Sequence, residues 1–249
     1  MPIHYLRRLT SRERSTAANQ HLGLSLAFVA GATNAGGFLA VQQYTSHMTG
    51  IVSHIADELA VGEVMAVGAG FGAVFCFLAG ASCSAVMVNW ARRQGLQSEF
   101  AAPLMVESIL LLCFGLLGHA FIGHNWMFVP ATVAILCFIM GLQNAVVTKV
   151  SRAEIRTTHI TGIVTDLGIE LGKLFYWNVA IHGDKVVANR ARLRLLSSLL
   201  AMFFLGGVAG ALGFKHIGFV STIPLALLVF LLAAVPVFDD VWRRVRGRY

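Results

Sequence analysis

Two short polar segments stand out in a sequence that is otherwise very apolar. The first runs from Thr45 to Gly62, TSHMTGIVSHIADELAVG, and the second from Thr157 to Leu174, TTHITGIVTDLGIELGKL. We call them the first and second TG segments, after the Thr-Gly pair near the start of each. Both carry histidine and acidic side chains, which together can bind a small solute or transfer a proton. They are therefore the candidate site.

The spacing of these polar groups places them on one side of each segment if the segment is helical. At about 100° per residue, positions 0, 7 and 11 lie within about 20° of one line. Those positions hold His47, His54 and Glu58 in the first copy, and His159, Asp166 and Glu170 in the second. The opposite face is apolar, with Ile51, Ile55 and Leu59, then Ile163, Leu167 and Leu171. A polar stripe of this kind belongs on a protein interior or a water-filled cavity when it lies at membrane depth.

The start of each segment has the composition of a helix N-terminus. The hydroxyl side chains that precede it are expected to cap backbone N–H groups: Thr45 and Ser46, then Thr157 and Thr158. The positive end of the helix dipole would attract an anion, and glycine permits close approach by a partner helix or ligand. The sequence therefore adds four substrate-binding candidates: Thr49, Gly50, Thr161 and Gly162.

Three further polar residues lie in apolar surroundings. Asn34 and Asn144 could line the same cavity as the TG segments, and hydrogen bonding between helices is an equally open role. Glu107 is the one carboxylate in the middle of a predicted span. It is a candidate proton acceptor, although pairing with a hydroxyl or histidine would make it structural. With Glu58 and Glu170 it forms the set of proton-coupling candidates.

No metal ion or other cofactor is predicted. His47 and His54 would be separated by about 10 Å of helix rise, which is too far for both to bind one ion. The chain contains no HExxH motif and no clustered Cys and His residues. GxSxG, P-loop and dinucleotide-binding signatures also do not occur outside an apolar span.

The composition is typical of a multi-pass membrane protein. Hydrophobic residues make up 57% of the 249 residues and charged residues only 12%, whereas soluble domains carry about 25% charged residues. The mean hydropathy is +0.72. Six apolar blocks are long enough to cross a hydrocarbon core: His21–Val41, Val64–Trp90, Ala101–Ile122, Met127–Thr148, Leu195–Phe214 and Ile217–Phe238.

Basic residues predict the orientation, because cytoplasmic flanks of spans carry an excess of Lys and Arg. No Lys or Arg occurs between Ser15 and Ala91, whereas Lys149, Arg152 and Lys173 flank the second TG segment. We expect a cytoplasmic segment at 1–20, one transmembrane domain at 21–238 and a basic cytoplasmic tail at 239–249. The net charge of +7 is then an orientation signal, and no nucleic-acid partner is expected.

The two TG segments predict an internal repeat. Each follows the first span of a three-span half, one half at about 21–122 and the other at about 127–238. The similarity extends upstream, where GATNAGG at Gly31 matches GLQNAVV at Gly141. An odd number of spans inverts the second copy, as in many secondary transporters. We expect a 3+3 inverted repeat in which each TG segment forms a re-entrant or half-spanning helix. The alternative interpretation, in which each TG segment is an amphipathic helix lying flat on a membrane face, stays open.

Small residues at every fourth position of the second span predict a smooth face for close helix packing. They are Gly68, Gly72, Cys76, Gly80 and Ser84, and Gly206 and Gly210 are expected to act in the same way in the fifth span. A homodimer through these faces is a further expectation.

The chain resembles the YoaK-like family of bacterial multi-pass membrane proteins, long known only as a domain of unknown function. The stretches that carry the resemblance are AGATNAGGF…TSHMTG and GLQNAVVTKVSRAEIRTTHITGIVTDLG, and it extends over about residues 20 to 240. The family typically has Asp at the position of Asn34 and often Asn at the position of Ile51. The resemblance implies an integral protein of the bacterial cytoplasmic membrane, and it implies no substrate.

Three hypotheses of function follow. The first is a secondary transporter or channel for a small polar or ionic solute, with proton coupling through histidine and carboxylates. The second is a membrane enzyme whose polar stripes supply a general acid and base. The third is a membrane scaffold or sensor that transports nothing. The inverted repeat favours the first, with the lipid bilayer and an unknown small solute as partners.

Overall fold

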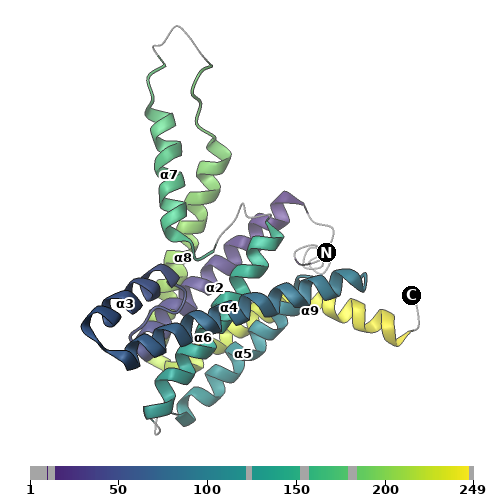
Figure 1. The fold of residues 1–249 in the computed structure, drawn as a ribbon. Helices are drawn as coiled ribbons and strands as arrows, with labels where there is room; N and C mark the ends of the chain where they lie inside the picture. The colour runs from purple at the N-terminus through teal and green to yellow at the C-terminus, as the bar shows by residue number, and fades with distance from the viewer. Residues whose placement is uncertain (1–9, 11–14, 122–124, 152–156, 179–183, 247–249) are drawn as a thin grey trace.

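The computed structural model describes residue 10 and residues 15–121, 125–151, 157–178 and 184–246. All regular structure in these ranges is helical (Figure 1), so the predicted all-α class is confirmed. The helices are α2 (Thr16–Val41), α3 (Met48–Val61), α4 (Val64–Arg93), α5 (Ala101–Phe121), α6 (Asn125–Val150), α7 (Ile160–Phe175), α8 (Arg190–Ile217), the short 3-10 helix η1 (Gly218–Ser221) and α9 (Thr222–Val245).

Local sequence explains where several helices begin and end. The Ser15 hydroxyl accepts a hydrogen bond from the backbone N–H of Ala18 and caps α2. Asn189 caps α8 in the same way through the N–H of Arg192. Gly62 ends α3 with a φ of 84°, a left-handed conformation that glycine adopts at no steric cost. That turn lets α4 start immediately after α3.

The helices pack in a pattern that is the same for both halves of the chain. Helix α2 packs against α8, and α6 packs against α4. Helix α3 lies on α4, α7 lies on α8, and α5 pairs with α9. If α2, α3, α4 and α5 are exchanged for α6, α7, α8 and α9 respectively, the list of packed pairs stays the same. Each half therefore contributes its first helix to the other half, and neither half forms a separate domain.

The two outer helix pairs cross at glycines that allow the backbones to touch. In α2 and α8, a Cβ on Gly31 would overlap the carbonyl oxygen of Phe203, and a Cβ on Gly206 would overlap that of Phe28. The α4–α6 crossing repeats this arrangement with Gly80 on Phe138 and Gly141 on Phe77. The predicted close packing is thus confirmed for Gly80 and Gly206. Gly68 and Gly72 have open space instead.

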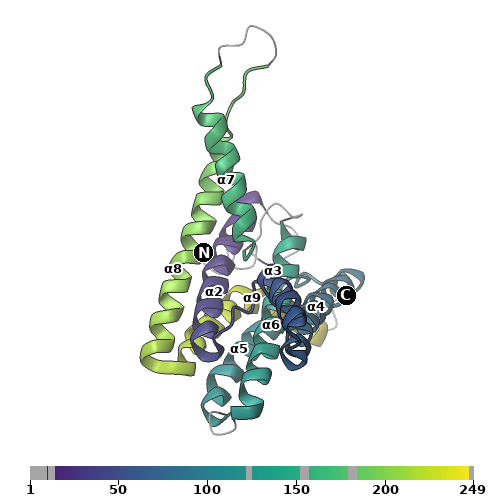
Figure 2. The same ribbon diagram turned by 60° about the vertical axis from the view of Figure 1, so that its left-hand side comes forward.

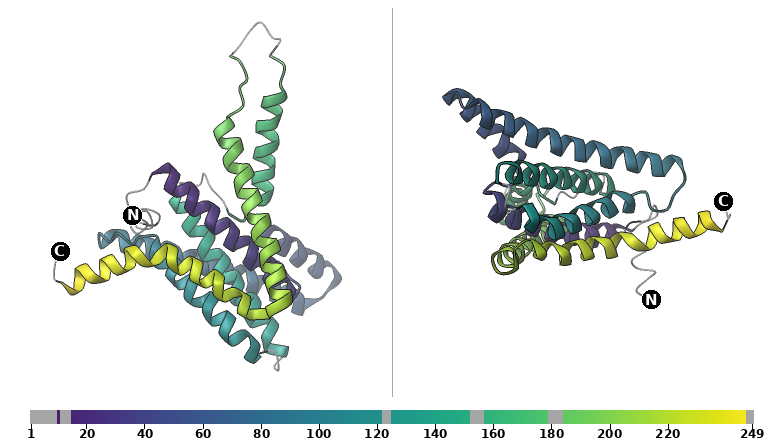
Figure 3. Two further views of the ribbon diagram at one scale, coloured as in Figure 1. Left: turned by 180° about the vertical axis from the view of Figure 1, so that it is seen from behind. Right: turned by 90° about the horizontal axis from the view of Figure 1, so that it is seen from below.

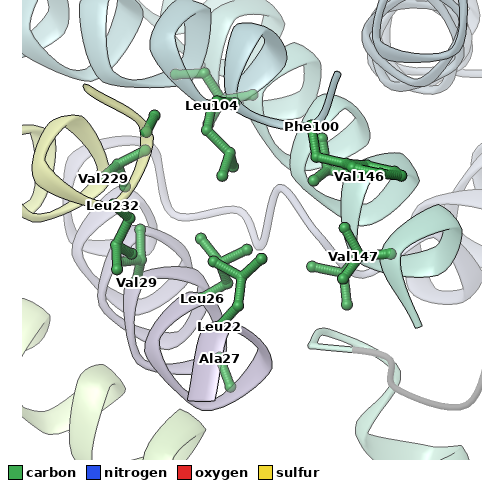
Figure 4. Close-up of a cluster of buried hydrophobic side chains, with 14 of the residues drawn as sticks. Leu22, Leu26, Ala27, Val29, Phe100, Leu104, Val146, Val147, Val229 and Leu232 are labelled. Atoms are coloured by element: carbon green, nitrogen blue, oxygen red, sulfur yellow. The ribbon is translucent and has the colours of Figure 1, made fainter. Parts of the chain in front are cut away.

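The main core lies where α2, α5, α6 and α9 meet (Figure 4). Its buried side chains include Leu22, Leu26 and Val29 of α2, Leu104 of α5, Val146 and Val147 of α6, and Val229 and Leu232 of α9. Viewed from below, α4 runs along one edge of the bundle and α9 along the opposite edge (Figure 3, right). Helix α4 leaves most of its apolar surface exposed, including Phe71 and Phe75. An exposed apolar surface of this size fits contact with lipid.

Four helical stretches of the described chain are long and apolar enough to cross a membrane. They are Thr16–Val41, Val64–Arg93, Val129–Val150 and Arg190–Trp242. The last contains α8, η1 and α9, and α5 is apolar over the shorter stretch Ala101–Leu116. The chain is therefore a helical, apolar protein of membrane type. The predicted sixth block starts too early, because Ile217 is the last residue of α8 and the chain turns at Gly218 with a φ of 62°.

Candidate functional site

The first TG segment begins alongside the preceding helix, not beyond its end. The backbone N–H and the hydroxyl of Ser46 both donate to Oδ1 of Asn34, at 3.2 Å and 2.9 Å. Asn34 precedes Val41, the last residue of α2, by about 10 Å of helix rise. The chain therefore turns back along α2 after Gln42, and Thr45 is completely buried there. Helix α3 starts level with the interior of α2.

The second TG segment begins in the same way. The hydroxyl of Thr158 donates to Oδ1 of Asn144 at 2.7 Å, and Thr157 is completely buried. Asn144 precedes Val150, the last residue of α6, by about 9 Å of helix rise. Its amide group also donates to the carbonyl oxygen of Met140 at 2.7 Å. The two asparagines thus hold equivalent positions and anchor equivalent hydroxyl groups.

These anchors replace the helix caps that the sequence suggests. His47 and His159 are the N-cap residues, and neither α3 nor α7 has a side-chain cap hydrogen bond. The capping role expected for the hydroxyls before each helix is therefore wrong, because Ser46 and Thr158 instead bond the asparagine of the preceding helix. Nothing in the sequence of the segment alone distinguishes these two partners.

Each histidine ring lies on the glycine three residues later. A Cβ on Gly50 would overlap the ring of His47, and a Cβ on Gly162 would overlap the ring of His159. The close neighbour of each glycine is thus the histidine of its own segment, where the sequence suggested a partner helix or a ligand. Each glycine leaves the space that the ring of an exposed histidine occupies at the start of α3 or α7. Thr49 and Thr161 are exposed beside them.

The predicted division of α3 into two faces holds over its first turns. Ile51 and Ile55 are buried, and Ile55 packs on Gly70 of α4. The polar side is accessible: Nδ1 of His54 lies 3.5 Å from Oε1 of Glu58, with side chains 59% and 23% exposed. In the part of the chain that the structure describes, the first polar stripe is therefore open to a solute, lipid or water. Leu59 departs from the pattern, because it is exposed as well.

The second polar stripe is bound to the start of α8. Asp166 pairs with Arg192 at 2.9 Å. The buried carboxylate of Glu170 pairs with Lys173 at 2.8 Å and accepts the backbone N–H of Asn189 at 2.7 Å. The hydrogen bond from Lys173, together with that from Asn189, lowers the pKa of Glu170. The proton role suggested for Glu170 stays a prediction, and its contacts favour a structural role.

Glu107 lies in the interior of α5 between the buried residues Leu104 and Leu111. Its side chain is completely buried, and neither carboxylate oxygen has a hydrogen-bond partner among the described residues. The neighbouring Ser108 is satisfied, because its hydroxyl donates to the carbonyl oxygen of Ala226 at 2.8 Å. A buried carboxyl group without a partner is costly unless it is protonated or becomes hydrated, so it is the clearest functional candidate in the core.

Other buried polar atoms also lack partners within the described ranges. Gln143 donates to the carbonyl oxygen of Leu26 at 3.0 Å, and its own Oε1 is unpaired. The hydroxyls of Thr33, Thr45 and Thr157 are unpaired too. Thr33 and Gln143 directly precede Asn34 and Asn144, and Thr45 and Thr157 directly precede the anchored Ser46 and Thr158. Sequence reasoning missed Thr33, although its position before Asn34 corresponds to that of Gln143 before Asn144.

Among the described residues, no group of three or more His, Cys, Asp or Glu side chains is arranged to hold a metal ion. The site is instead a set of hydroxyl, amide, imidazole and carboxyl groups. Such groups can bind a small polar molecule or an ion and can transfer a proton.

Comparison with protein families gives one match, to the family described as "Protein of unknown function (DUF1275)", over residues 22–235. The chain belongs to this family. It is the same family as the YoaK-like one that the sequence resembles, so that prediction is confirmed. Comparisons with curated proteins and with solved structures gave no match. The family description assigns no activity to its residues.

Proposed function

We propose that the chain is a secondary transporter or channel of the bacterial cytoplasmic membrane for a small polar or ionic solute. The observation that carries the proposal is the matched pair of anchors, Asn34 with Ser46 and Asn144 with Thr158. Each anchor starts a helix level with the interior of the helix before it. Helices that begin inside the membrane are the usual elements of transporter binding sites.

The proposed architecture is an inverted repeat of six spans, α2, α4 and α5, then α6, α8 and α9. The exchange symmetry of the packing pairs and the matching glycine crossings support two equivalent halves. With three spans in each half, the first TG segment enters from the outer face and the second from the cytoplasmic face. The absence of Lys and Arg from Ser15 to Ala91 and their abundance around α7 support this orientation.

The proposed solute site combines the two segment starts. His47, Thr49 and Gly50 contribute from one side, and His159, Thr161 and Gly162 from the other. Asn34 and Asn144 hold the two starts in place. The exposed threonines and imidazoles offer hydrogen-bond donors and acceptors, and the N-terminal ends of α3 and α7 add partial positive charge. This arrangement favours a solute with an anionic or strongly polar group.

Glu107 is the proposed proton carrier. Its buried carboxyl group has no competing ion pair among the described residues, so a change in hydration during transport would change its protonation. Glu58 is a weaker candidate because it already lies beside His54, and Asp166 and Glu170 are engaged with α8.

The test is current measurement on proteoliposomes adsorbed to a solid-supported membrane. Concentration jumps would be applied with inorganic anions, inorganic cations, carboxylates and amino acids, each at two pH values. We expect a protein-dependent transient current with at least one class of solute. Gly162→Leu should abolish it, whereas Gly168→Leu, on the same helix but with open space at its Cβ, should not. A silent wild-type protein across all classes, or equal currents in both variants, would contradict the proposal.

A further inference from the structure

The second half carries an extension that the first half lacks. Helices α3 and α4 are separated only by residues 62–63, whereas α7 and α8 are separated by residues 176–189. Figures 1 and 2 both show α7 and the start of α8 extending well beyond the bundle. We call α7, the described residues of its link and the start of α8 the α7–α8 arm. The repeat does not require this extension, so it needs another explanation.

The arm is held together by its own polar contacts. The ion pair of Asp166 with Arg192 and the hydrogen bond from Asn189 to Glu170 join α7 to α8. Farther out, Asn178 and Val186 bond in both directions, through Nδ2 to the carbonyl oxygen at 3.1 Å and through the backbone N–H to Oδ1 at 2.9 Å. These bonds hold the two described sides of the link together, so the arm can act as one element.

The outer end of the arm exposes large apolar side chains. Phe175 is 79% exposed, Trp177 85% and Val187 74%. Tyr176 lies between the two aromatic residues and is also exposed. Aromatic rings of this kind are enriched at the boundary between headgroups and hydrocarbon. Such a cluster would otherwise cost free energy in water.

Basic side chains are also exposed on the arm. Lys185, Arg190 and Arg194 are exposed, and no ion pair involves them among the described residues. Arg190 and Arg194 lie in the first turns of α8, where the helix dipole disfavours positive charge. Their presence therefore does not serve helix stability. It points to an anionic surface outside the chain.

We infer that the α7–α8 arm docks on the anionic lipid headgroups of the cytoplasmic leaflet of the protein's own bilayer, with Phe175 and Trp177 inserted at the headgroup boundary. This inference rests on the proposed topology, which places the arm on the cytoplasmic side. A second copy of the chain is a poorer fit, because the exposed acid Asp184 lies on the arm itself, beside Lys185, and two other acids on that side are engaged. Glu99 pairs with Arg92, Asp240 accepts the N–H of Ser98, and both acids are buried.

The test uses the full-length protein in lipid nanodiscs, with its four native cysteines replaced by alanine and Val187→Cys labelled with an environment-sensitive dye. We expect the emission to shift to the blue when the discs contain 30% phosphatidylglycerol in phosphatidylcholine, in comparison with phosphatidylcholine alone. Each Lys or Arg near an anionic surface contributes about a fivefold preference. The double variant Lys185→Gln/Arg190→Gln should therefore reduce the ratio of docked to undocked arm about 30-fold.

The matched control is the same dye at Ala60→Cys, at the end of α3 on the hairpin that has no basic residues. Its emission should not depend on phosphatidylglycerol. Equal emission of the Val187 label in both lipids would overturn the inference. So would a blue shift that occurs only in discs holding two copies, whatever the lipid. Nanodiscs expose both membrane faces, so this result tests the docking of the arm and does not depend on which face the arm is on. A wrong topology would be detected only in vesicles of known orientation.

Discussion

Gly31 of α2 lies against the backbone of Phe203 in α8 so closely that any side chain at position 31 would overlap the carbonyl oxygen. Gly141 of α6 has the same relation to Phe77 of α4. A Phe-x-x-Gly sequence occurs at the crossing in each of the four helices, as FVAG, FLAG, FIMG and FFLG. The two halves of the chain thus have the same residue types at equivalent helix crossings.

Replacing Gly31 with alanine should destabilise the protein by about 1–3 kcal/mol, because the added methyl group meets backbone that cannot move independently. Gly141→Ala should cost a similar amount, since its surroundings are equivalent. Thermal unfolding in detergent would measure both. The control is Gly72→Ala in α4, which has open space and should be neutral or slightly stabilising. Equal melting temperatures for Gly31→Ala and Gly72→Ala would refute the close crossing.

Ser46→Ala should destabilise the start of α3 by about 1 kcal/mol, the usual net contribution of one hydrogen bond. The substitution removes the 2.9 Å bond to Asn34 and leaves the backbone bond in place. Ser53→Ala, on the exposed side of the same helix, is the control and should change little. Hydrogen exchange in residues 45–52 would compare the two. Identical protection in both variants would show that the anchor is unimportant.

The α7–α8 arm should loosen at acidic pH. Because hydrogen bonds from Lys173 and Asn189 lower the pKa of Glu170, its contribution is present above the ordinary value of 4.5 and is lost as pH falls through the lower folded value. Amide exchange of α7, corrected for its intrinsic pH dependence, should therefore increase below about pH 4.5 in the wild type. In Glu170→Gln it should be fast already at pH 7. An arm with the same protection in both proteins at pH 7 would contradict this assignment.

Much of the helical framework could be predicted from the sequence. Most of the predicted apolar blocks lie within observed helices because long uninterrupted apolar runs can be buried only as helices in this setting. The repeated TG segments also gave the starts of α3 and α7 to within a few residues. Helix ends set by a single left-handed residue, as at Gly218, were less accurate.

Most of the site's partners could not be predicted, because they depend on three-dimensional contacts. Ser46 is as suitable for a helix cap as for a bond to Asn34, and only the fold back along α2 decides between them. Glu58 and Glu170 occupy the same position in the repeat, yet Glu170 is bonded by Lys173 of α7 and by Asn189, which lies at the end of a link that the first half lacks. The link has no hydrophobic periodicity, so the sequence contains no pattern that predicts the α7–α8 arm.

Glu107→Gln should leave membrane insertion and melting temperature nearly unchanged, because the amide has the same size and carries no charge that must be desolvated. If Glu107 carries the proton, the variant should lose the pH dependence of the transport current. Asp184→Asn, an exposed acid on the link, should retain it. The same pH dependence in the wild type and in Glu107→Gln would remove Glu107 from the mechanism.

The central claim is that the two TG segments enter the protein from opposite faces of the membrane. It is tested most directly by reacting Thr49→Cys and Thr161→Cys, in a cysteine-free chain, with an impermeant maleimide in right-side-out and inside-out bacterial vesicles. Ala60→Cys and Gln94→Cys mark the two faces. Both residues are exposed, and neither has the left-handed backbone conformation of the nearby Gly62 and Gly95. The account predicts that residue 49 reacts only in right-side-out vesicles, together with residue 60. Residue 161 should react only in inside-out vesicles, together with residue 94. Reaction of residues 49 and 161 from the same face would contradict it.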